Sequence, residues 1–244
     1  MRPVIGITSS FNTDTNSDPP RDQFYLVAAY ADAVLTAGGL PMPLPVPPVD
    51  HEGVHDDLLA RVDGLLFTGG PDLNPARYND TPHPQTEIMD ARRDAFDVPF
   101  FRRADAARVP ILAICLGFQE AHVARGGRLI QHVDDVPGDP LIQHHLPKGR
   151  SAFHTVRIAP DSRLARIVGA TEIEVNSRHH QAAQTEHQGR GLRPVAFAPD
   201  GLLEASEDCD GRFLLAVQWH PENLIDRPEH LSLFQALVDA ARRG

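Results

Sequence analysis

Residues 109–119 join an apolar strand directly to a helix, with no loop between them. The apolar stretch Ile111–Ile114 stops at Cys115, and Gly117 follows two positions later. A strand that turns at once into a helix lifts the side chain at the turn out of the sheet and into a crevice. Small residues are needed two positions before and after that turn, where strand and helix pass close together. Ala113 and Gly117 occupy these positions.

Cys115 can be read in two ways. An isolated cysteine in an apolar run is more often a small core residue than a reactive one. A helix starting at Leu116, however, would point its first N–H groups at the sulfur and favour the thiolate. The reactive interpretation therefore needs a base elsewhere in the chain.

Residues 213–222 supply that base. A second apolar strand ends here at His220, and Pro221 favours an extended backbone for the residue before it. In an extended chain, residues two apart project to the same side, so Glu222 can orient the imidazole of His220. Cys115, His220 and Glu222 are therefore predicted to form a nucleophile–base–carboxylate triad. Taken alone, His220 would be a capped strand end and Glu222 a surface residue.

Attack on an amide carbonyl also creates an oxyanion, which needs preplaced donors. One predicted donor is the backbone N–H of Leu116, directly after the nucleophile. The turn at residues 68–72 holds two consecutive glycines after an apolar strand, and glycines let backbone amides approach a ligand closely. A tight turn without a ligand would use the same residues.

Apolar strands alternate with helices along the first half of the chain, which predicts a parallel sheet with helices on both faces. From residue 129 the pattern changes to short strands and turns, which predicts a smaller antiparallel β portion in the C-terminal half. We expect a single α/β domain over residues 1–244. The predicted strands are Val4–Thr8, Leu40–Leu44, 62–67 and Ile111–Ile114, and the predicted helices are 24–36, Ala91–Ala106, 117–125 and 228–242. Residues 12–20 are predicted to be a surface loop, with a lid over the site as the alternative.

Taken together, the motifs of this chain resemble those of class I glutamine amidotransferase-like proteins, and more narrowly those of the γ-glutamyl-γ-aminobutyrate hydrolase family of cysteine peptidases. The resemblance implies a flavodoxin-like α/β fold. It departs from the family at Ala113, where glycine is more common. The matching blocks are residues 3–8, 37–41, 69–73, 115–119, 126–131, 175–181, 200–205 and 218–222.

Carried over to this chain, the resemblance implies a role for each matching residue. Cys115 becomes the nucleophile, with His220 as general base and acid and Glu222 as its orienting carboxylate. The resemblance makes the backbones of Gly70 and Leu116 the oxyanion donors. It places Gln119 and the block His179, His180 and Gln181 near the substrate, although that block can also be read as a polar turn.

The pairs His144-His145 and His179-His180, together with His154, invite a metal interpretation. Neighbouring histidines in an extended chain point in opposite directions, so each pair offers at most one ligand to a common site. The sequence has no zinc motif of paired cysteines or His-Glu-x-x-His. We therefore predict no metal and no cofactor.

The formal net charge of −10 argues against nucleic acid or an anionic membrane as a partner. No stretch approaches the ~20 apolar residues of a membrane span, and no secretory signal is seen. Two cysteines make no disulfide framework, so we expect a cytoplasmic protein. Cys209 lies in a predicted hairpin turn and has no assigned role. The sequence does not determine the oligomeric state, and a homodimer is compatible with it.

Three functions are compatible with these observations. The first is hydrolysis of a γ-glutamyl amide of a small amine. The second is a glutaminase subunit that delivers ammonia to a separate synthetase, because both activities cleave the same bond. The third is a non-enzymatic binding protein on the same fold, which the intact triad residues disfavour. The sequence does not identify the leaving amine.

Overall fold

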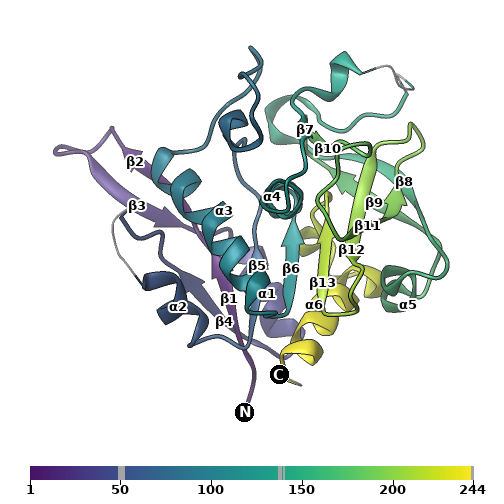
Figure 1. Ribbon diagram of the computed structural model, residues 1–244, viewed down its shortest axis with the longest axis horizontal. Coiled ribbons are helices and arrows are strands. Elements are labelled where there is room, and N and C mark those ends of the chain that lie inside the picture. Colours follow the sequence, from purple (N-terminus) through teal and green to yellow (C-terminus); the bar gives the residue numbers. More distant parts are fainter. Residues whose placement is uncertain (49–52, 137–138, 140, 243–244) are drawn as a thin grey trace.

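The computed structural model of the chain describes residues 1–48, 53–136, 139 and 141–242. Its centre is a nine-stranded sheet with the strand order β4-β1-β5-β6-β13-β12-β11-β8-β9. Helices cover both faces of this sheet (Figure 1). No helix in the described ranges is long and apolar enough to cross a membrane.

One half of the sheet is parallel, as the alternation of strands and helices predicts. Its strands are β4 (Leu40–Leu44), β1 (Val4–Thr8), β5 (Gly64–Phe67), β6 (Ile111–Ile114) and β13 (Leu214–Val217). β13 lies beside β6, with Val217 opposite Ile114. Ligands bind beyond the carboxyl ends of such strands. The residues that follow β5, β6 and β13 therefore meet at one edge of the sheet.

The other half of the sheet is antiparallel and begins where β12 pairs with β13. Its strands are β12 (Leu203–Asp208), β11 (Leu192–Phe197), β8 (Ala152–Ile158) and β9 (Glu172–Ser177). A small separate sheet pairs β7 (Leu129–Ile130) with β10 (Ala182–Ala183). The predicted α/β class with an antiparallel C-terminal portion is confirmed. The antiparallel strands continue the main sheet.

Two apolar cores lie on the two faces of the sheet, because successive strand residues point to opposite sides. Leu66 belongs to one core, whereas its neighbours Leu65 and Phe67 belong to the other. The first core contains residues of α1 (Ala28–Thr36), α5 (Arg163–Val168) and α6 (Pro228–Ala241). The second contains residues of α3 (Ala91–Ala106) and α4 (Leu116–Ala124), with partly buried leucines of α2 (Val54–Leu59) at its margin. Four short 3-10 turns complete the described elements: η1 (Pro75–Tyr78), η2 (Val133–Asp135), η3 (Pro147–Gly149) and η4 (Pro221–Asn223).

Within the segment predicted as a surface loop, residues 15–20 form the largely exposed turn of a hairpin, as predicted, whereas residues 12–14 belong to a strand. β2 (Ser10–Asp14) pairs with β3 (Arg21–Tyr25), and both project from the body of the fold (Figure 1). Its polar composition resembles that of a loop, but the rings of Phe11 and Phe24 pack across the strands with centroids 5.6 Å apart. Cross-strand pairs of this kind stabilise an exposed hairpin.

Other boundaries differ by a few residues. The helix predicted over 24–36 starts at Ala28, because Phe24 is part of β3. The strand predicted over 62–67 starts at Gly64. The strands Val4–Thr8, Leu40–Leu44 and Ile111–Ile114 and the helix Ala91–Ala106 have the predicted bounds. Cys209 is exposed in the turn after β12, as predicted.

Candidate active site

Cys115 lies between β6 and α4 in a conformation that L-residues rarely adopt, with φ 55° and ψ −102°. Such a backbone costs about 1–3 kcal/mol and persists where the surroundings enforce it. The neighbouring Gly117 makes the turn feasible, because a Cβ there would lie 2.7 Å from the carbonyl oxygen of Phe67. Ala113 is fully buried in β6, so the methyl group that departs from the family pattern is accommodated. The predicted elbow is therefore formed.

His220 follows β13, the strand next to the one that carries Cys115. Its Nδ1 lies 2.7 Å from Oε1 of Glu222, and both side chains are buried. Burial lowers the pKa of the imidazole, but the charges of Cys115 and Glu222 outweigh it and raise the pKa of His220 to about 10. The ring of His220 also donates a hydrogen bond to Cys115, which raises the pKa of the imidazole further. The structure brings the three predicted triad residues together.

Asn176, at the end of β9, holds the backbone of His220 from both sides. The N–H of His220 donates to the side-chain oxygen of Asn176, and the Asn176 amide donates to the His220 carbonyl, both at 2.9 Å. The nearby guanidinium of Arg178 lies 3.7 Å from Oε1 of Glu222. Asn176 belongs to the block 175–181 that matches the family, but the sequence predicted a substrate-side loop only for His179, His180 and Gln181. Asn176 positions the base.

Two backbone N–H groups are available for an oxyanion. The N–H of Gly69 donates to the Tyr30 hydroxyl at 3.0 Å, and that of Gly117 donates to the Thr68 carbonyl at 3.2 Å. Within the described ranges, the N–H groups of Gly70 and Leu116 have no hydrogen-bond partner. These are the two donors that the sequence predicted.

Arg93 and Tyr30 support the glycine turn, and sequence reasoning did not assign them that role. Arg93 is buried, binds Asp97 at 2.7 Å and donates to the Gly69 carbonyl at 3.3 Å. A Cβ at position 70 would lie 2.2 Å from the Arg93 guanidinium, so this packing requires Gly70. The i,i+4 spacing of Arg93 and Asp97 is a signal that could have indicated an ion pair, but not its burial. Nothing in the sequence near Tyr30 indicates a role.

Gln119 lies on α4, one turn beyond Cys115, and is buried. Its side-chain amide donates to the Gln181 carbonyl and to Oε1 of Gln218, both at 3.3 Å. The predicted neighbours Gln119 and Gln181 are thus brought together. The Gln119 nitrogen thus binds protein groups, and among the described residues its oxygen accepts no hydrogen bond.

His179 and His180 point to different surroundings. His180 lies half-buried with Nε2 2.9 Å from the carboxylate of Asp72, just beyond the glycine turn. His179 is buried, with Nδ1 2.9 Å from the Gln181 carbonyl and Nε2 3.4 Å from Glu204. Both ring nitrogens of His179 therefore face protein groups. This differs from the substrate contact predicted for it, because the chain turns its ring into the antiparallel half.

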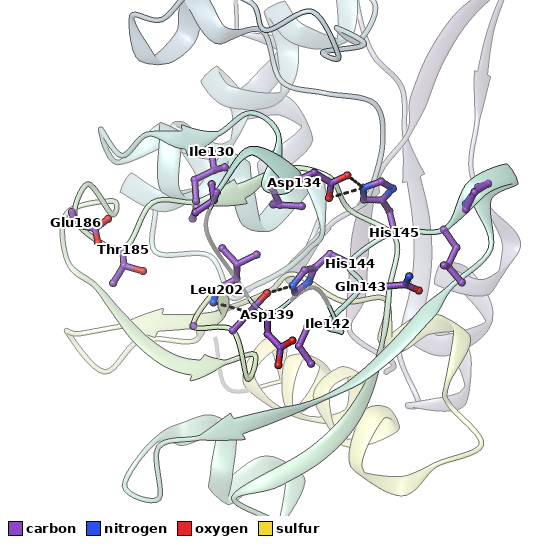
Figure 2. Close-up of a pocket in the computed structure, with 17 residues that line it drawn as sticks. Ile130, Asp134, Asp139, Ile142, Gln143, His144, His145, Thr185, Glu186 and Leu202 are labelled. Atoms are coloured by element: carbon purple, nitrogen blue, oxygen red, sulfur yellow. Dashed lines mark hydrogen bonds and ion pairs between the residues drawn. The ribbon is translucent and has the colours of Figure 1, made fainter.

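Ile130 and Val136 take part in lining two cavities, and Cys115 lines neither of them. The larger, about 890 Å³, is lined by His144, His145 and Leu202 among others (Figure 2). Its wall reaches a second polar cluster, in which one ligand atom each of His144, His154 and Glu204 lies within 4.8 Å of the other two. This cluster is separate from the triad and could hold a metal ion.

Comparison with known proteins places the chain in a family. The Peptidase C26 family model matches residues 3–222. Protein Rv2859c of Mycobacterium tuberculosis, whose name assigns it provisionally to the glutamine amidotransferases, is 39% identical and covers 98% of this chain and 75% of its own. The γ-glutamyl-γ-aminobutyrate hydrolase PuuD of Escherichia coli K12 is 33% identical over 87% of this chain and 85% of its own.

The solved structures confirm the fold. The glutaminase domain of Trypanosoma brucei CTPS with bound acivicin superposes with a TM-score of 0.68 over 98% of this chain and 94% of that domain, at 16% identity. With its elbow and its match from residue 3 to residue 222, this chain belongs to the Peptidase C26 family of class I glutamine amidotransferase-like enzymes.

Proposed function

We propose that this protein hydrolyses the γ-glutamyl amide bond of a small γ-glutamyl amine, with Cys115 as nucleophile. The observation that carries the proposal is the strained elbow of Cys115 beside the buried His220–Glu222 pair. A relative named γ-glutamyl-γ-aminobutyrate hydrolase supports the substrate class.

The first half of the reaction forms a thioester. The sulfur of Cys115 attacks the γ-carbonyl carbon, and the carbonyl oxygen becomes an oxyanion held by the N–H groups of Gly70 and Leu116. When the intermediate collapses, the C–N bond breaks and the protonated imidazole of His220 gives its proton to the departing amine. Glu222 keeps Nδ1 of His220 protonated, so that Nε2 is the atom that transfers protons.

The second half hydrolyses the thioester. Neutral His220 removes a proton from water, and the resulting hydroxide attacks the same carbonyl carbon. The C–S bond breaks, glutamate is released and Cys115 is regenerated as thiolate beside the imidazolium. The charge balance is that of the starting pair, which agrees with the raised pKa of His220.

The test is a comparison of substrates with one enzyme preparation. γ-Glutamyl-γ-aminobutyrate, γ-glutamylputrescine and glutamine are assayed by released glutamate. The α-linked isomer of the first compound and the Cys115→Ala variant serve as controls. We expect a γ-glutamyl amine to exceed glutamine by roughly 100-fold or more in kcat/KM, because glutamine offers no amine side for contacts beyond the scissile bond.

Two results would contradict the proposal. Equal cleavage of the α-linked isomer would mean that the site does not read the γ-glutamyl group. Glutamine as the preferred substrate would favour the alternative function, a glutaminase subunit of an amidotransferase.

A further inference from the structure

The side chains of Glu204, His144, His154 and His179 meet inside the antiparallel half of the sheet. Glu204 is on β12 and is fully buried. Its Oε1 lies 3.5 Å from Nδ1 of His144, 3.5 Å from Nε2 of His154 and 3.4 Å from Nε2 of His179. All three rings are buried too. Three buried rings thus face one oxygen of a buried carboxylate.

Each imidazole uses its other nitrogen as a hydrogen-bond donor. His154 donates from Nδ1 to the Thr155 carbonyl at 3.1 Å, and His179 donates from Nδ1 to the Gln181 carbonyl at 2.9 Å. A carbonyl oxygen only accepts, so the proton of each neutral ring is on Nδ1. His144 has the opposite tautomer, because its Nε2 lies 2.8 Å from the Asp200 carboxylate, the bond drawn as a dashed line in Figure 2.

In these tautomers, one unprotonated nitrogen of each ring faces the carboxylate of Glu204. Nδ1 of His144, Nε2 of His154, Nε2 of His179 and both oxygens of Glu204 are buried without a hydrogen-bond partner. Lone pairs in contact repel one another, and unpaired buried polar groups are costly. One extra proton, on His144, would satisfy one nitrogen and leave the other two facing the same oxygen.

A divalent metal ion would satisfy the three ring nitrogens and one oxygen of Glu204 at once. Zinc bound to nitrogen and oxygen at 2.0–2.1 Å in a tetrahedron separates its ligands by about 3.3–3.4 Å. The three distances from Glu204 to the rings are close to three of the six edges of that tetrahedron. The ligand atoms of His144, His154 and Glu204 all lie within 4.8 Å of one another. Donation of the second ring N–H to a carbonyl or carboxylate is the usual outer shell of a metal-bound histidine.

We propose that Glu204, His144 and His154, whose ligand atoms lie within 4.8 Å of one another, bind one divalent transition-metal ion. His179, whose Nε2 lies 3.4 Å from Glu204, moves onto the ion as the fourth ligand, and Zn²⁺ is the ion that best fits this three-nitrogen, one-oxygen set. The charges of Glu204 and Asp200 balance the ion. All four ligands come from the protein, which is typical of a structural site. The ion ties β8 and β12 to the segment whose Gln181 carbonyl holds Gln119. The cavity lined by His144 gives it a route in from solvent.

The proposed site follows the rule applied to the sequence but departs from the prediction of no metal. Each histidine pair contributes one ring, His144 and His179, and the partners His145 and His180 face Asp134 and Asp72. The third ring, His154, and the carboxylate of Glu204 come from strands that are far apart in the sequence. No local zinc motif therefore indicates them.

The test is zinc binding by the tag-free, full-length protein. After treatment with a chelator, the protein is titrated with Zn²⁺ against a chromogenic competitor, and its metal content is measured by mass spectrometry. We expect one tight site per chain and, with Co²⁺, the intense visible absorption of a tetrahedral ion. The Cys115→Ser/Cys209→Ser double variant keeps the site, because no thiol is a ligand.

Substitutions of ligands and of neighbouring histidines localise the site. His154→Gln removes a ligand and should weaken Zn²⁺ binding by roughly 100-fold or more, and Asp200→Asn, an outer-shell change, by roughly 10- to 100-fold. His145→Gln and His132→Gln are matched controls from the partly exposed histidine group nearby and should bind as the parent does.

The proposal is overturned if the wild-type protein takes up no tight zinc, or if its Co²⁺ complex lacks tetrahedral absorption. It is also overturned if His154→Gln and His145→Gln bind zinc equally. Because the wild-type titration needs no variant, a misfolded variant does not remove the test.

Discussion

In the part of the chain that the structure describes, histidine meets glutamate at two buried sites, which differ in how many rings face the carboxylate. At the elbow, one ring faces Glu222 at 2.7 Å, a hydrogen-bond distance that assigns the proton between them. In the antiparallel half, three rings face Glu204 at 3.4–3.5 Å, too far for good hydrogen bonds. The short distance is suited to moving a proton. The longer ones leave room for an ion.

The largest expected effect is a loss of hydrolysis at the elbow that leaves zinc binding at Glu204 unchanged. Cys115→Ala removes the nucleophile but little core volume, so we expect γ-glutamyl hydrolysis to fall by at least roughly 10⁴-fold. The zinc titration should be unchanged. If this variant lost both properties, the two regions would not be independent and the comparison would fail.

The next effect tests the two carboxylates against each other. Glu222→Gln should lower kcat/KM by roughly 10²- to 10⁴-fold, because the amide no longer fixes and stabilises the imidazolium. Its thermal midpoint should move little. Glu204→Gln should instead lower the thermal midpoint of the zinc-loaded protein, since it removes a ligand that binds only in the folded state. Parallel kinetics and calorimetry on both variants check this, and equal kinetic losses without any thermal change would contradict it.

His122 is another buried imidazole, and no carboxylate of the described ranges pairs with it. Burial, and then the charge of Arg125, lower the pKa of His122 to about 3. Its Nδ1 accepts the N–H of Gly189, so the folded state needs the neutral ring.

In the unfolded chain this histidine takes up a proton near pH 6.5. The stability it contributes is therefore present above pH 6.5 and is lost as the pH falls toward 3. At pH 5 the loss is about 2 kcal/mol. Urea unfolding at pH 7 and pH 5 measures it, with His122→Gln as the comparison. An unaltered pH slope in that variant would disprove the assignment.

The smallest effect concerns Gln119, whose nitrogen is engaged with Gln181 and Gln218. If its oxygen binds the amino-acid head of a substrate, Gln119→Ala should lower kcat/KM for γ-glutamyl amides by about tenfold, the cost of one hydrogen bond. Alkylation of Cys115 by iodoacetamide, which has no glutamyl head, should keep its rate. Equal losses in the two reactions would show that Gln119 shapes the nucleophile and does not read the substrate.

The sequence predicted the elbow well because its signals are local. Ala113, Cys115 and Gly117 lie within five residues, and His220 and Glu222 are only two apart, although Glu222 lies in the 3-10 turn η4 and not in the extended chain that the sequence predicted. The parallel register then brings the two strand ends together, since β6 and β13 are neighbours. Fold class and triad follow from such patterns.

The remaining parts depend on packing between distant segments. Nothing near Asn176 shows that its amide clamps His220, 44 residues away. Likewise, His154 and Glu204 meet only because β8 and β12 both flank β11. The polar hairpin of β2 and β3 was missed because its stabilising ring pair, Phe11 and Phe24, spans the turn.

The positive φ of Cys115 has an evolutionary consequence. Glycine adopts that conformation without strain, so replacing the nucleophile by glycine would relieve the backbone while silencing the enzyme. Selection for stability alone therefore opposes the cysteine, and only selection for turnover retains it. A lineage of this fold that had lost catalysis would be expected to acquire glycine at this position and to gain thermodynamic stability as it did so.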